Sequence, residues 1–392
     1  MPVAAYLYPW DVDGDPGAAD RIAALGVTEV SLAAAYHAVR AVTPFHPGHR
    51  IVTRDAAVYY RPDPARWTGA HLRPAGPDPA EVGSFERAAD TLRAAGLQVN
   101  AWVVVTHNGR LAAAHPECAV HNAFGDVYPW ALCAGSPAVA EYAAALAAEI
   151  AALDAVADVE LEACGWYGYD HGSAHDKTGG TPAGPAGRWL DACFCADCTA
   201  TLRVAGADSG AIAAAVRTAL NGSGPVPEGA ISDSAVPAEL AATLSSVRAA
   251  TAAAFLEHVV AAVRAAAPRQ QILVHAHPDP AQAGSNPGYE LTTLLGPAGA
   301  DGVILACPGP AGPAATAVAS AAREVAAVAP GRRVIATLPA VAALGADTGE
   351  LPAKAKAVLA AGATDLRLYH AGLASAADHA AQREAATAGR SA

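Results

Sequence analysis

The segment Val159–Asp176, VELEACGWYGYDHGSAHD, predicts a short β-strand followed by a loop rich in aromatic and titratable residues. Successive side chains of a strand point to opposite faces, so Val159 and Leu161 share one face while Glu160 and Glu162 share the other. In a closed parallel barrel the apolar pair must lie under the surrounding helices, because burying a carboxylate there would cost too much free energy. We therefore expect both glutamates to face the lumen, with Glu162 at its mouth.

Other strand candidates give the chain the alternating pattern of an eight-stranded barrel. In chain order, strands are expected at Ala4–Tyr8, Thr28–Leu32, Gln98–Val105, Asp158–Glu162, Ile272–His275, Gly302–Leu305, Arg333–Leu338 and Asp365–Tyr369. A doubly wound open sheet is the alternative, but no glycine-rich dinucleotide motif or phosphate loop follows any of these strands. The sequence thus predicts one α/β domain over residues 1–392, a (β/α)8 TIM barrel. It is expected to carry long loops after strands 2, 3 and 4 and a helical insertion before strand 5, at about residues 187–268.

Composition narrows the range of functions. Of the 392 residues, 53% are hydrophobic and 16% are charged, which is ample for a large core. A formal net charge of −12 argues against nucleic acid and anionic membrane surfaces, because both bind basic patches. The N-terminal sequence lacks a signal-peptide pattern, and no apolar run with the right flanks predicts a membrane span. We expect a cytoplasmic protein, and the sequence leaves a homo-oligomer open.

Histidine and aromatic residues gather where the predicted strands end. Barrel enzymes use the C-terminal strand ends and the loops after them, and half of the 14 histidines fall at or just beyond these ends. Each of these histidines taken alone is better explained as structural, so the clustering carries the argument. Aromatic rings stack on sugar C–H faces, while polar side chains bind the hydroxyls. The residues predicted to bind a sugar are Trp10, His37, His107, Asn108, Trp166, Tyr169, His171, His175, His275 and His370.

Glu162 is the strongest candidate for catalysis. At the barrel mouth beside aromatic residues it is expected to be partly desolvated, which raises a carboxyl pKa toward the working range of a general acid. A glycosidase normally needs a second carboxylate, and Asp170 is favoured because flanking glycines permit an exposed turn. Glu160 is better explained as a structural carboxylate. Alternation along strand 8 points Arg367 into the lumen, where it could neutralise Glu160.

Two other functions stay open at this point. Glu162, Asp170, His171 and His175 could instead hold a divalent metal, which would make the protein a metal-dependent hydrolase or lyase. A barrel that has lost its nucleophile could bind carbohydrate without cleaving it. Retained sugar binding without turnover, unchanged by Glu162→Gln, would identify that third class.

Three cysteines lie close together in the segment CFCADC, residues 193–198. Thiolates at this spacing favour zinc in a closed tetrahedral site, which requires a fourth ligand. Cys133 is preferred because it lies at the start of the helix after strand 3, next to the loop after strand 4. With no open position, such a zinc would be structural. The predicted ligands are Cys133, Cys193, Cys195 and Cys198, with Cys118 and Cys164 as alternatives for the fourth.

These motifs resemble a known family. The pairing of ALCAGSPAVAEY with CFCADC resembles the zinc-binding cysteines of family 42 β-galactosidases. More broadly, NAWVVVTHNGRL, HNAFGDVYPWALC and ELEACGWYGYDHGSAHDK resemble bacterial glycoside-hydrolase-like barrels. The resemblance implies a retaining glycosidase with its acid/base at strand 4, Glu162, acting on a small glycoside or oligosaccharide. The chain departs from the family at Leu161, where the family has Asn, and at Thr337-Leu338-Pro339, where the family has a nucleophilic Glu.

Overall fold

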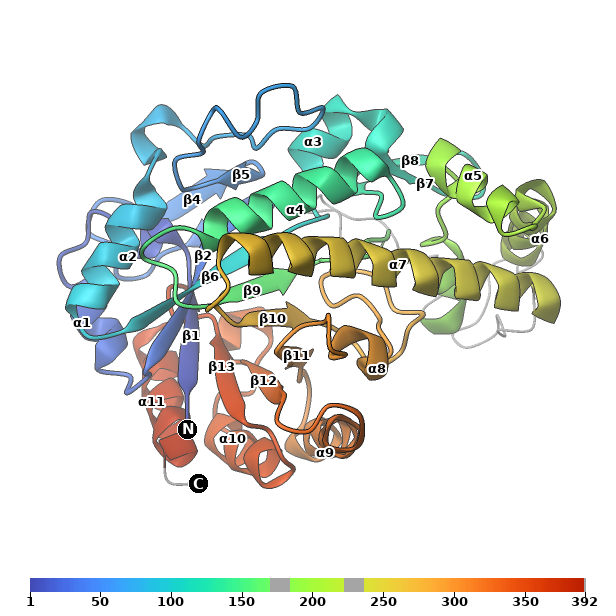
Figure 1. The fold of residues 1–392 in the computed structure, drawn as a ribbon. Helices are drawn as coiled ribbons and strands as arrows, with labels where there is room; N and C mark the ends of the chain where they lie inside the picture. The colour runs from blue at the N-terminus through green and yellow to red at the C-terminus, as the bar shows by residue number, and fades with distance from the viewer. Residues whose placement is uncertain (170–183, 222–235, 391–392) are drawn as a thin grey trace.

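The computed structural model describes residues 1–169, 184–221 and 236–390. Eight parallel strands form a closed barrel, because each pairs with the next in the chain and β13 pairs back onto β1 (Figure 1). The barrel strands are β1 (Val3–Leu7), β2 (Glu29–Tyr36), β6 (Gln98–Val104), β9 (Val159–Glu162), β10 (Ile272–His275), β11 (Gly302–Ala306), β12 (Arg333–Pro339) and β13 (Asp365–Tyr369). The predicted (β/α)8 fold is confirmed, and all eight expected strands are present within a few residues of their predicted bounds.

At least one helix follows each barrel strand and covers its outer face. These helices are α1 (Ala18–Ala23), α2 (Ser84–Ala94), α4 (Pro137–Ala151), α7 (Ala238–Ala266), α8 (Leu291–Leu294), α9 (Ala311–Val328), α10 (Leu351–Ala360) and α11 (Ala376–Arg390). In α9 the buried residues Ala314, Val318, Ala321 and Val325 recur at helical spacing, so this alanine-rich sequence still presents one continuous apolar stripe to the barrel.

The connections after β2 and β6 contain strands of their own. The segment from Arg40 to about Pro79, expected to be a long loop without periodicity, contains a hairpin of β3 (Val39–Val42) and β4 (Ile51–Arg54). It also contains β5 (Ala57–Val58), which pairs antiparallel with the end of β2. The connections after β2 and β6 also contain η2 (Pro79–Glu81), α3 (Gly109–Ala114), η3 (Pro116–Cys118), β7 (Ala119–His121) and β8 (Val127–Leu132). Two further short helices, η1 (Pro9–Asp11) and η6 (Ala342–Leu344), follow β1 and β12.

Helices also occupy the described part of the expected insertion before β10: η4 (Gly184–Trp189), α5 (Ala196–Val204), α6 (Ser209–Asn221) and the first half of α7. They form a small second core around Leu202, Ile212, Val216 and Leu244. Helix α7 runs along α4 over the barrel and extends beyond it to α5 and α6 (Figure 1). Its length and composition would let it cross a membrane, but its second half packs into the barrel's core through Phe255, Val259 and Val263.

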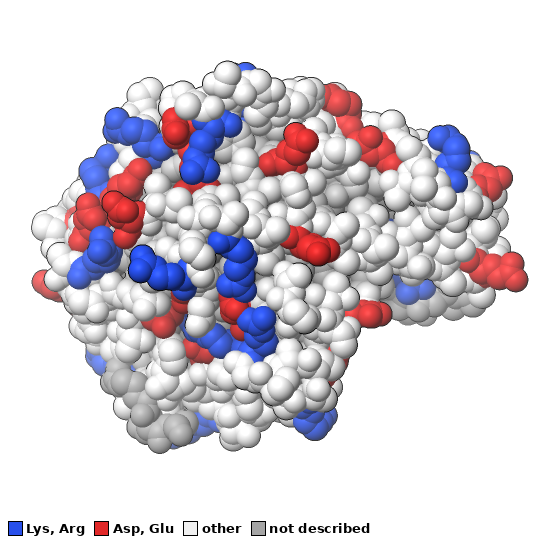
Figure 2. All heavy atoms as spheres, in the orientation of Figure 1, with Lys and Arg blue, Asp and Glu red and all other residues white. Residues whose placement is uncertain are grey.

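Surface charge is mixed on the face drawn in Figure 2. Lys and Arg side chains alternate with Asp and Glu side chains over the barrel. Most of the area over the part of α7 that extends beyond the barrel is uncharged. That face therefore presents no continuous basic surface among the residues that the structure describes. The expectation that the protein does not bind nucleic acid stays a prediction for the molecule as a whole.

The lumen follows the predicted alternation of β9. Val159 and Leu161 are fully buried in the core, while Glu160 points into the lumen and accepts a hydrogen bond from Arg367 Nε at 2.7 Å. This confirms the predicted pair between strands 4 and 8. The Ser31 hydroxyl donates to the same Glu160 oxygen at 2.8 Å, and Tyr6 donates to the other at 3.1 Å. Glu160, Arg367, Ser31 and Tyr6 thus form a buried ionic layer that closes the barrel below its mouth.

Candidate active site at the barrel mouth

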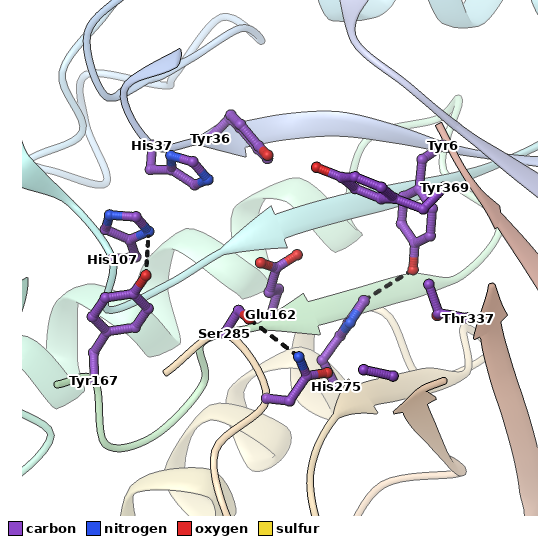
Figure 3. A pocket seen from close by; sticks show the side chains of 12 residues that line it. Tyr6, Tyr36, His37, His107, Glu162, Tyr167, His275, Ser285, Thr337 and Tyr369 are labelled. Carbon is purple, nitrogen blue, oxygen red and sulfur yellow. Dashed lines mark hydrogen bonds between the residues drawn. The ribbon is translucent and has the colours of Figure 1, made fainter. Parts of the chain in front are cut away.

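A cavity of about 200 Å³ opens above this layer, at the C-terminal ends of the barrel strands. Aromatic and imidazole side chains form most of its walls (Figure 3). The lining residues are Tyr6, Tyr36, His37, His107, Glu162, Tyr167, His275, Ser285, Asn286, Ala306, Thr337 and Tyr369. Glu162 is the single carboxylate in this lining, and no described Lys or Arg belongs to it.

Glu162 lies at the end of β9, half-buried in the cavity. Burial raises the pKa of its carboxyl from 4.5 to about 7, and the nearby Glu160 charge adds to the rise. The indole of Trp102 opposes this shift, since its Nε1–H donates a 2.6 Å hydrogen bond to Glu162 Oε2. The carboxyl can therefore exchange a proton near neutral pH, as a general acid or base must.

The backbone turns sharply directly after Glu162. Ala163 has a φ of +51°, in the left-handed region that residues with a side chain seldom adopt. Its carbonyl accepts hydrogen bonds from the Thr106 hydroxyl at 2.6 Å and the Thr106 amide at 3.0 Å, and its own amide donates to Ser285 O at 2.9 Å. Neighbouring segments thus fix the position of Glu162 at the strand end, and strained backbone of this kind is typical of functional sites.

A hydrogen-bonded chain links the cavity to the ionic layer beneath it. Tyr6 has one hydroxyl proton and donates it to Glu160, so its oxygen accepts from His275 Nε2 at 3.1 Å (Figure 3). Burial lowers the pKa of His275 to about 4, which keeps the imidazole neutral. His275 therefore carries its proton on Nε2, and a lone pair is left on Nδ1.

Four stacked rings from three strand ends form one wall of the cavity. Tyr36 stacks on His37, His37 on His107, and His107 on Tyr167, with ring centroids 4.1, 4.1 and 4.3 Å apart. A 2.8 Å hydrogen bond joins His107 Nδ1 and the Tyr167 hydroxyl. Such a wall is rigid, and it presents both ring surface and polar edges to a ligand.

The structure thus places Glu162, His37, His107 and His275 together, as the sequence analysis expected. Other residues predicted to bind sugar lie outside the lining. Asn108 caps α3 through its Oδ1, which accepts from Leu111 N at 3.0 Å. Trp166 donates from Nε1 to Arg248 O at 3.0 Å, beside the cysteine cluster.

Trp10, Tyr169 and His370 also lie outside that lining. Trp10 and His370 are buried and both stack on Tyr8, with centroid distances of 4.5 and 4.3 Å. The Tyr169 amide donates to Asp191 Oδ1 at 3.0 Å. The remaining predicted residues, Asp170, His171 and His175, fall outside the described part of the chain.

Several lining residues were not identified from the sequence. Tyr6, Thr337 and Tyr369 lie on barrel strands, and the face alternation that pointed to Glu162 could have identified them as lumen residues. Ser285 and Asn286 come from the irregular connection after β10, where no periodic signal exists.

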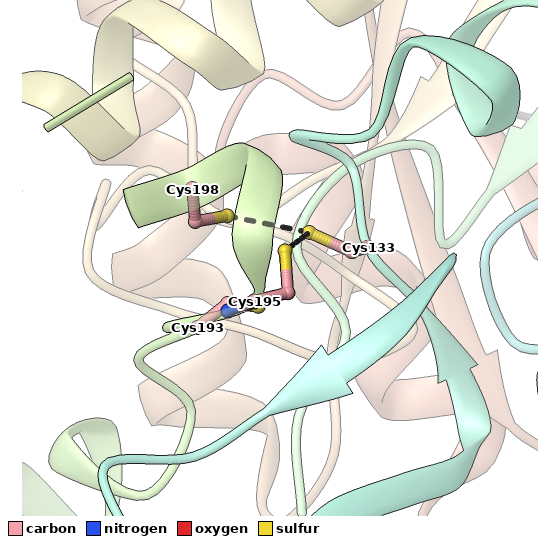
Figure 4. Close-up of side chains that lie close together, drawn as sticks. All are labelled: Cys133, Cys193, Cys195 and Cys198. Atoms are coloured by element: carbon pink, nitrogen blue, oxygen red, sulfur yellow. Dashed lines mark hydrogen bonds between the residues drawn. The ribbon is translucent and has the colours of Figure 1, made fainter. Parts of the chain in front are cut away.

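Four buried cysteines converge beside the barrel (Figure 4). The sulfurs of Cys133, Cys193, Cys195 and Cys198 all lie within 4.8 Å of one another, and Cys133 Sγ is 3.4 Å from Cys198 Sγ and 3.7 Å from Cys195 Sγ. A tetrahedral zinc ion about 2.3 Å from each sulfur would separate the sulfurs by about 3.8 Å. The cluster therefore fits a metal site, and Cys133 is the fourth member as predicted, in place of Cys118 or Cys164.

The surroundings of the cluster also suit thiolates. The amides of His121 and Cys195 donate to Cys193 Sγ at 3.4 and 3.5 Å. Gly135 is required nearby, because a Cβ there would lie 2.9 Å from Cys198 Sγ. One other group of His, Cys, Asp and Glu side chains in the described residues is as compact, and neither group includes Glu162.

No family model and no curated protein matches the sequence. Among solved structures, α-L-fucosidase isoenzyme 2 from Paenibacillus thiaminolyticus matches 99% of this chain over 49% of its own length, at TM-score 0.59 and 11% identity. A β-galactosidase from the Antarctic haloarchaeon Halorubrum lacusprofundi matches 99% of this chain over 58% of its length, at TM-score 0.59 and 12% identity. A GH42 β-galactosidase from G. stearothermophilus matches 78% of this chain over 48% of its own length, at TM-score 0.50 and 12% identity.

The similarity between this chain and the three solved structures is a similarity of fold. The chain spans between 48% and 58% of the length of the three structures, and at 11–12% identity they establish the shared barrel architecture. The resemblance noted in the sequence, to glycoside-hydrolase barrels including family 42, is confirmed at that level.

Proposed function

We propose that the protein is a glycoside hydrolase in which Glu162 is the general acid/base. The observation that carries the proposal is a carboxyl with a pKa of about 7 at the base of an aromatic and imidazole pocket, at the end of the barrel where such enzymes act. Protonated Glu162 would donate to the glycosidic oxygen as the bond to the sugar breaks. The likeness of the barrel to glycosidase structures supports the same chemistry.

The dimensions and charge of the pocket favour a small, uncharged sugar. Its volume of about 200 Å³ is below the 300–1,000 Å³ typical of drug-sized ligands and suits a single sugar unit. With no described cationic side chain in the lining and a neutral His275, nothing there favours a carboxylated or phosphorylated sugar. We propose a small glycoside or a terminal sugar of an oligosaccharide, cleaved in the cytoplasm.

The second carboxylate of the reaction is proposed from the sequence alone. Thr337 lies on β12, where the resembled family has its nucleophile, so the described lining supplies no partner for Glu162. Asp170 stays the proposed partner. Its assignment is tested by comparing Asp170→Asn with wild type on the same substrate.

The first experiment is hydrolysis of a panel of aryl glycosides in both anomeric forms by the purified protein. Turnover of one sugar in one anomeric form is the expected result. Failure to cleave any of them, combined with tight binding of a free sugar, would replace hydrolysis with carbohydrate binding as the function.

Trp102→Phe is expected to move the pH dependence of this activity upward. The indole stabilises ionised Glu162, and a hydrogen bond to a charged group is worth about 1.5–3 kcal/mol, so its loss should raise the pKa of Glu162 by about one to two units. The alkaline limb of kcat/KM, which reports the acid in the free enzyme, should shift by the same amount. An unshifted limb would mean that Glu162 is not the group being titrated.

We further propose that the four-cysteine cluster holds a structural zinc ion. Bound there, zinc would link the segment at Cys133 to the segment at residues 193–198 and do no chemistry. Cys198→Ser is expected to lose the metal and to destabilise the fold by about 2–4 kcal/mol, as loss of a cross-link does. Zinc content and urea unfolding measure both effects. Cys307→Ser, at a buried cysteine outside the cluster, should keep the metal.

A further inference from the structure

Away from the barrel mouth, metal-binding side chains from two different connections meet at the surface. His71 comes from the connection after β2, while His115, Glu117 and Cys118 surround η3 in the connection after β6. Both imidazoles contact the same carboxylate oxygen, Glu117 Oε1: His71 Nε2 at 3.0 Å and His115 Nδ1 at 3.3 Å. Cys118 is buried below them, and its sulfur lies within 4.8 Å of the His71 and Glu117 ligand atoms.

The two nitrogen–oxygen separations are close to those of ligands around one ion. Nitrogen and oxygen atoms about 2.1 Å from a tetrahedral zinc ion lie about 3.4 Å apart. The observed 3.0 and 3.3 Å therefore place Glu117 Oε1 at ligand spacing from each imidazole. His71, Glu117 and Cys118 already lie within 4.8 Å of one another, whereas His115 lies outside that group and would have to move to join them around one ion. Two imidazoles, one carboxylate and one thiol are a donor set for zinc and similar transition metals, whereas magnesium and calcium prefer oxygen ligands.

We propose that His71, His115, Glu117 and Cys118 form a second metal site, separate from the four-cysteine cluster, that binds a divalent transition metal such as zinc. Its occupancy would hold the connections after β2 and β6 together. The side chains of His71 and Glu117 are 54% and 58% exposed, so an ion there would exchange readily with solvent. The site adjoins the cysteine cluster, since Cys133 N donates to Cys118 O at 2.8 Å.

The test measures how much zinc the folded protein binds on titration, in addition to any zinc that it retains after extensive dialysis. Wild type is expected to gain one exchangeable equivalent per chain on titration with zinc chloride, measured by equilibrium dialysis and elemental analysis. The comparison with a variant of His71 and His115 separates this site from the cysteine cluster, because that variant leaves all four cysteines of the cluster unchanged. The double variant His71→Ala/His115→Ala should bind the added ion more than about 100-fold more weakly, since even outer-shell partners of a metal contribute 10–100-fold.

His258→Ala, an exposed histidine on α7 outside the site, is the matched control and should gain the equivalent as wild type does. Circular dichroism of the double variant establishes that it is folded, and both substituted side chains lie at the surface. Absence of an added equivalent in wild type would overturn the proposal. So would an equivalent that the double variant binds as tightly as wild type, because the ion would then lie elsewhere.

Discussion

Glu162→Gln is expected to lose about 10²–10⁴-fold in kcat/KM on whichever glycoside the protein cleaves, with its fold intact. Glutamine keeps the size of the side chain and can still accept from Trp102 Nε1, but its amide is too weak an acid to transfer a proton to the leaving oxygen. Asp279→Asn is the matched control, an exposed acid after β10 outside the pocket lining, and should keep full activity. Equal activity in Glu162→Gln and wild type would make Glu162 a structural residue.

The pH dependence of wild type and of Glu162→Gln tests the effect of Glu162 on activity and its effect on stability. As a general acid it must be protonated, so wild-type kcat/KM should fall as pH rises through about 7, the pKa that burial gives its carboxyl. This pKa lies above the ordinary 4.5, so ionising Glu162 between those values destabilises the folded state. Glu162→Gln should therefore be more stable than wild type toward urea at pH 8, and equal to it at pH 4.

Much of the barrel could be predicted because its strands are nearly continuous apolar runs between helices. In β9 the alternation of Val159, Glu160, Leu161 and Glu162 predicted both the faces and the Glu160–Arg367 pair. The β3–β4 hairpin was missed for the opposite reason. Its two short strands have mostly exposed residues, such as Val42 and Ile51, so no apolar pattern separates them from the surrounding loop.

The site could be predicted where one residue type has one plausible use. Four thiols have few alternatives to a metal, and the cysteine grouping is confirmed. Histidine, tryptophan and asparagine have many uses, so position along the chain does not determine their role. Asn108 follows β6 closely, yet its side chain caps α3, while Tyr6 and Thr337 reach the cavity from within strands that look like core sequence.

Arg367→Met is expected to destabilise the protein by about 3–5 kcal/mol, the largest effect on stability that we predict. Both Arg367 and Glu160 are completely buried, and Arg367 Nε donates to Glu160 Oε1 at 2.7 Å. Methionine fills most of the same volume but leaves the Glu160 charge in a medium of low dielectric constant, where Ser31 and Tyr6 are its remaining hydrogen-bond donors among the described residues. Urea unfolding monitored by tryptophan fluorescence measures the loss.

A double variant separates the effect of the unpaired Glu160 charge from the effect of poorer packing. In Glu160→Gln/Arg367→Met the completely buried Glu160 charge is removed, while Glu29, whose Oε2 lies 3.5 Å from the Arg367 guanidinium in the wild type, keeps its charge. Most of the lost stability should therefore return, as it does when both partners of a buried pair are replaced. A deficit that persists in the double variant would assign the role of Arg367 to volume. The ionic layer below the pocket would then be incidental to the stability of the barrel.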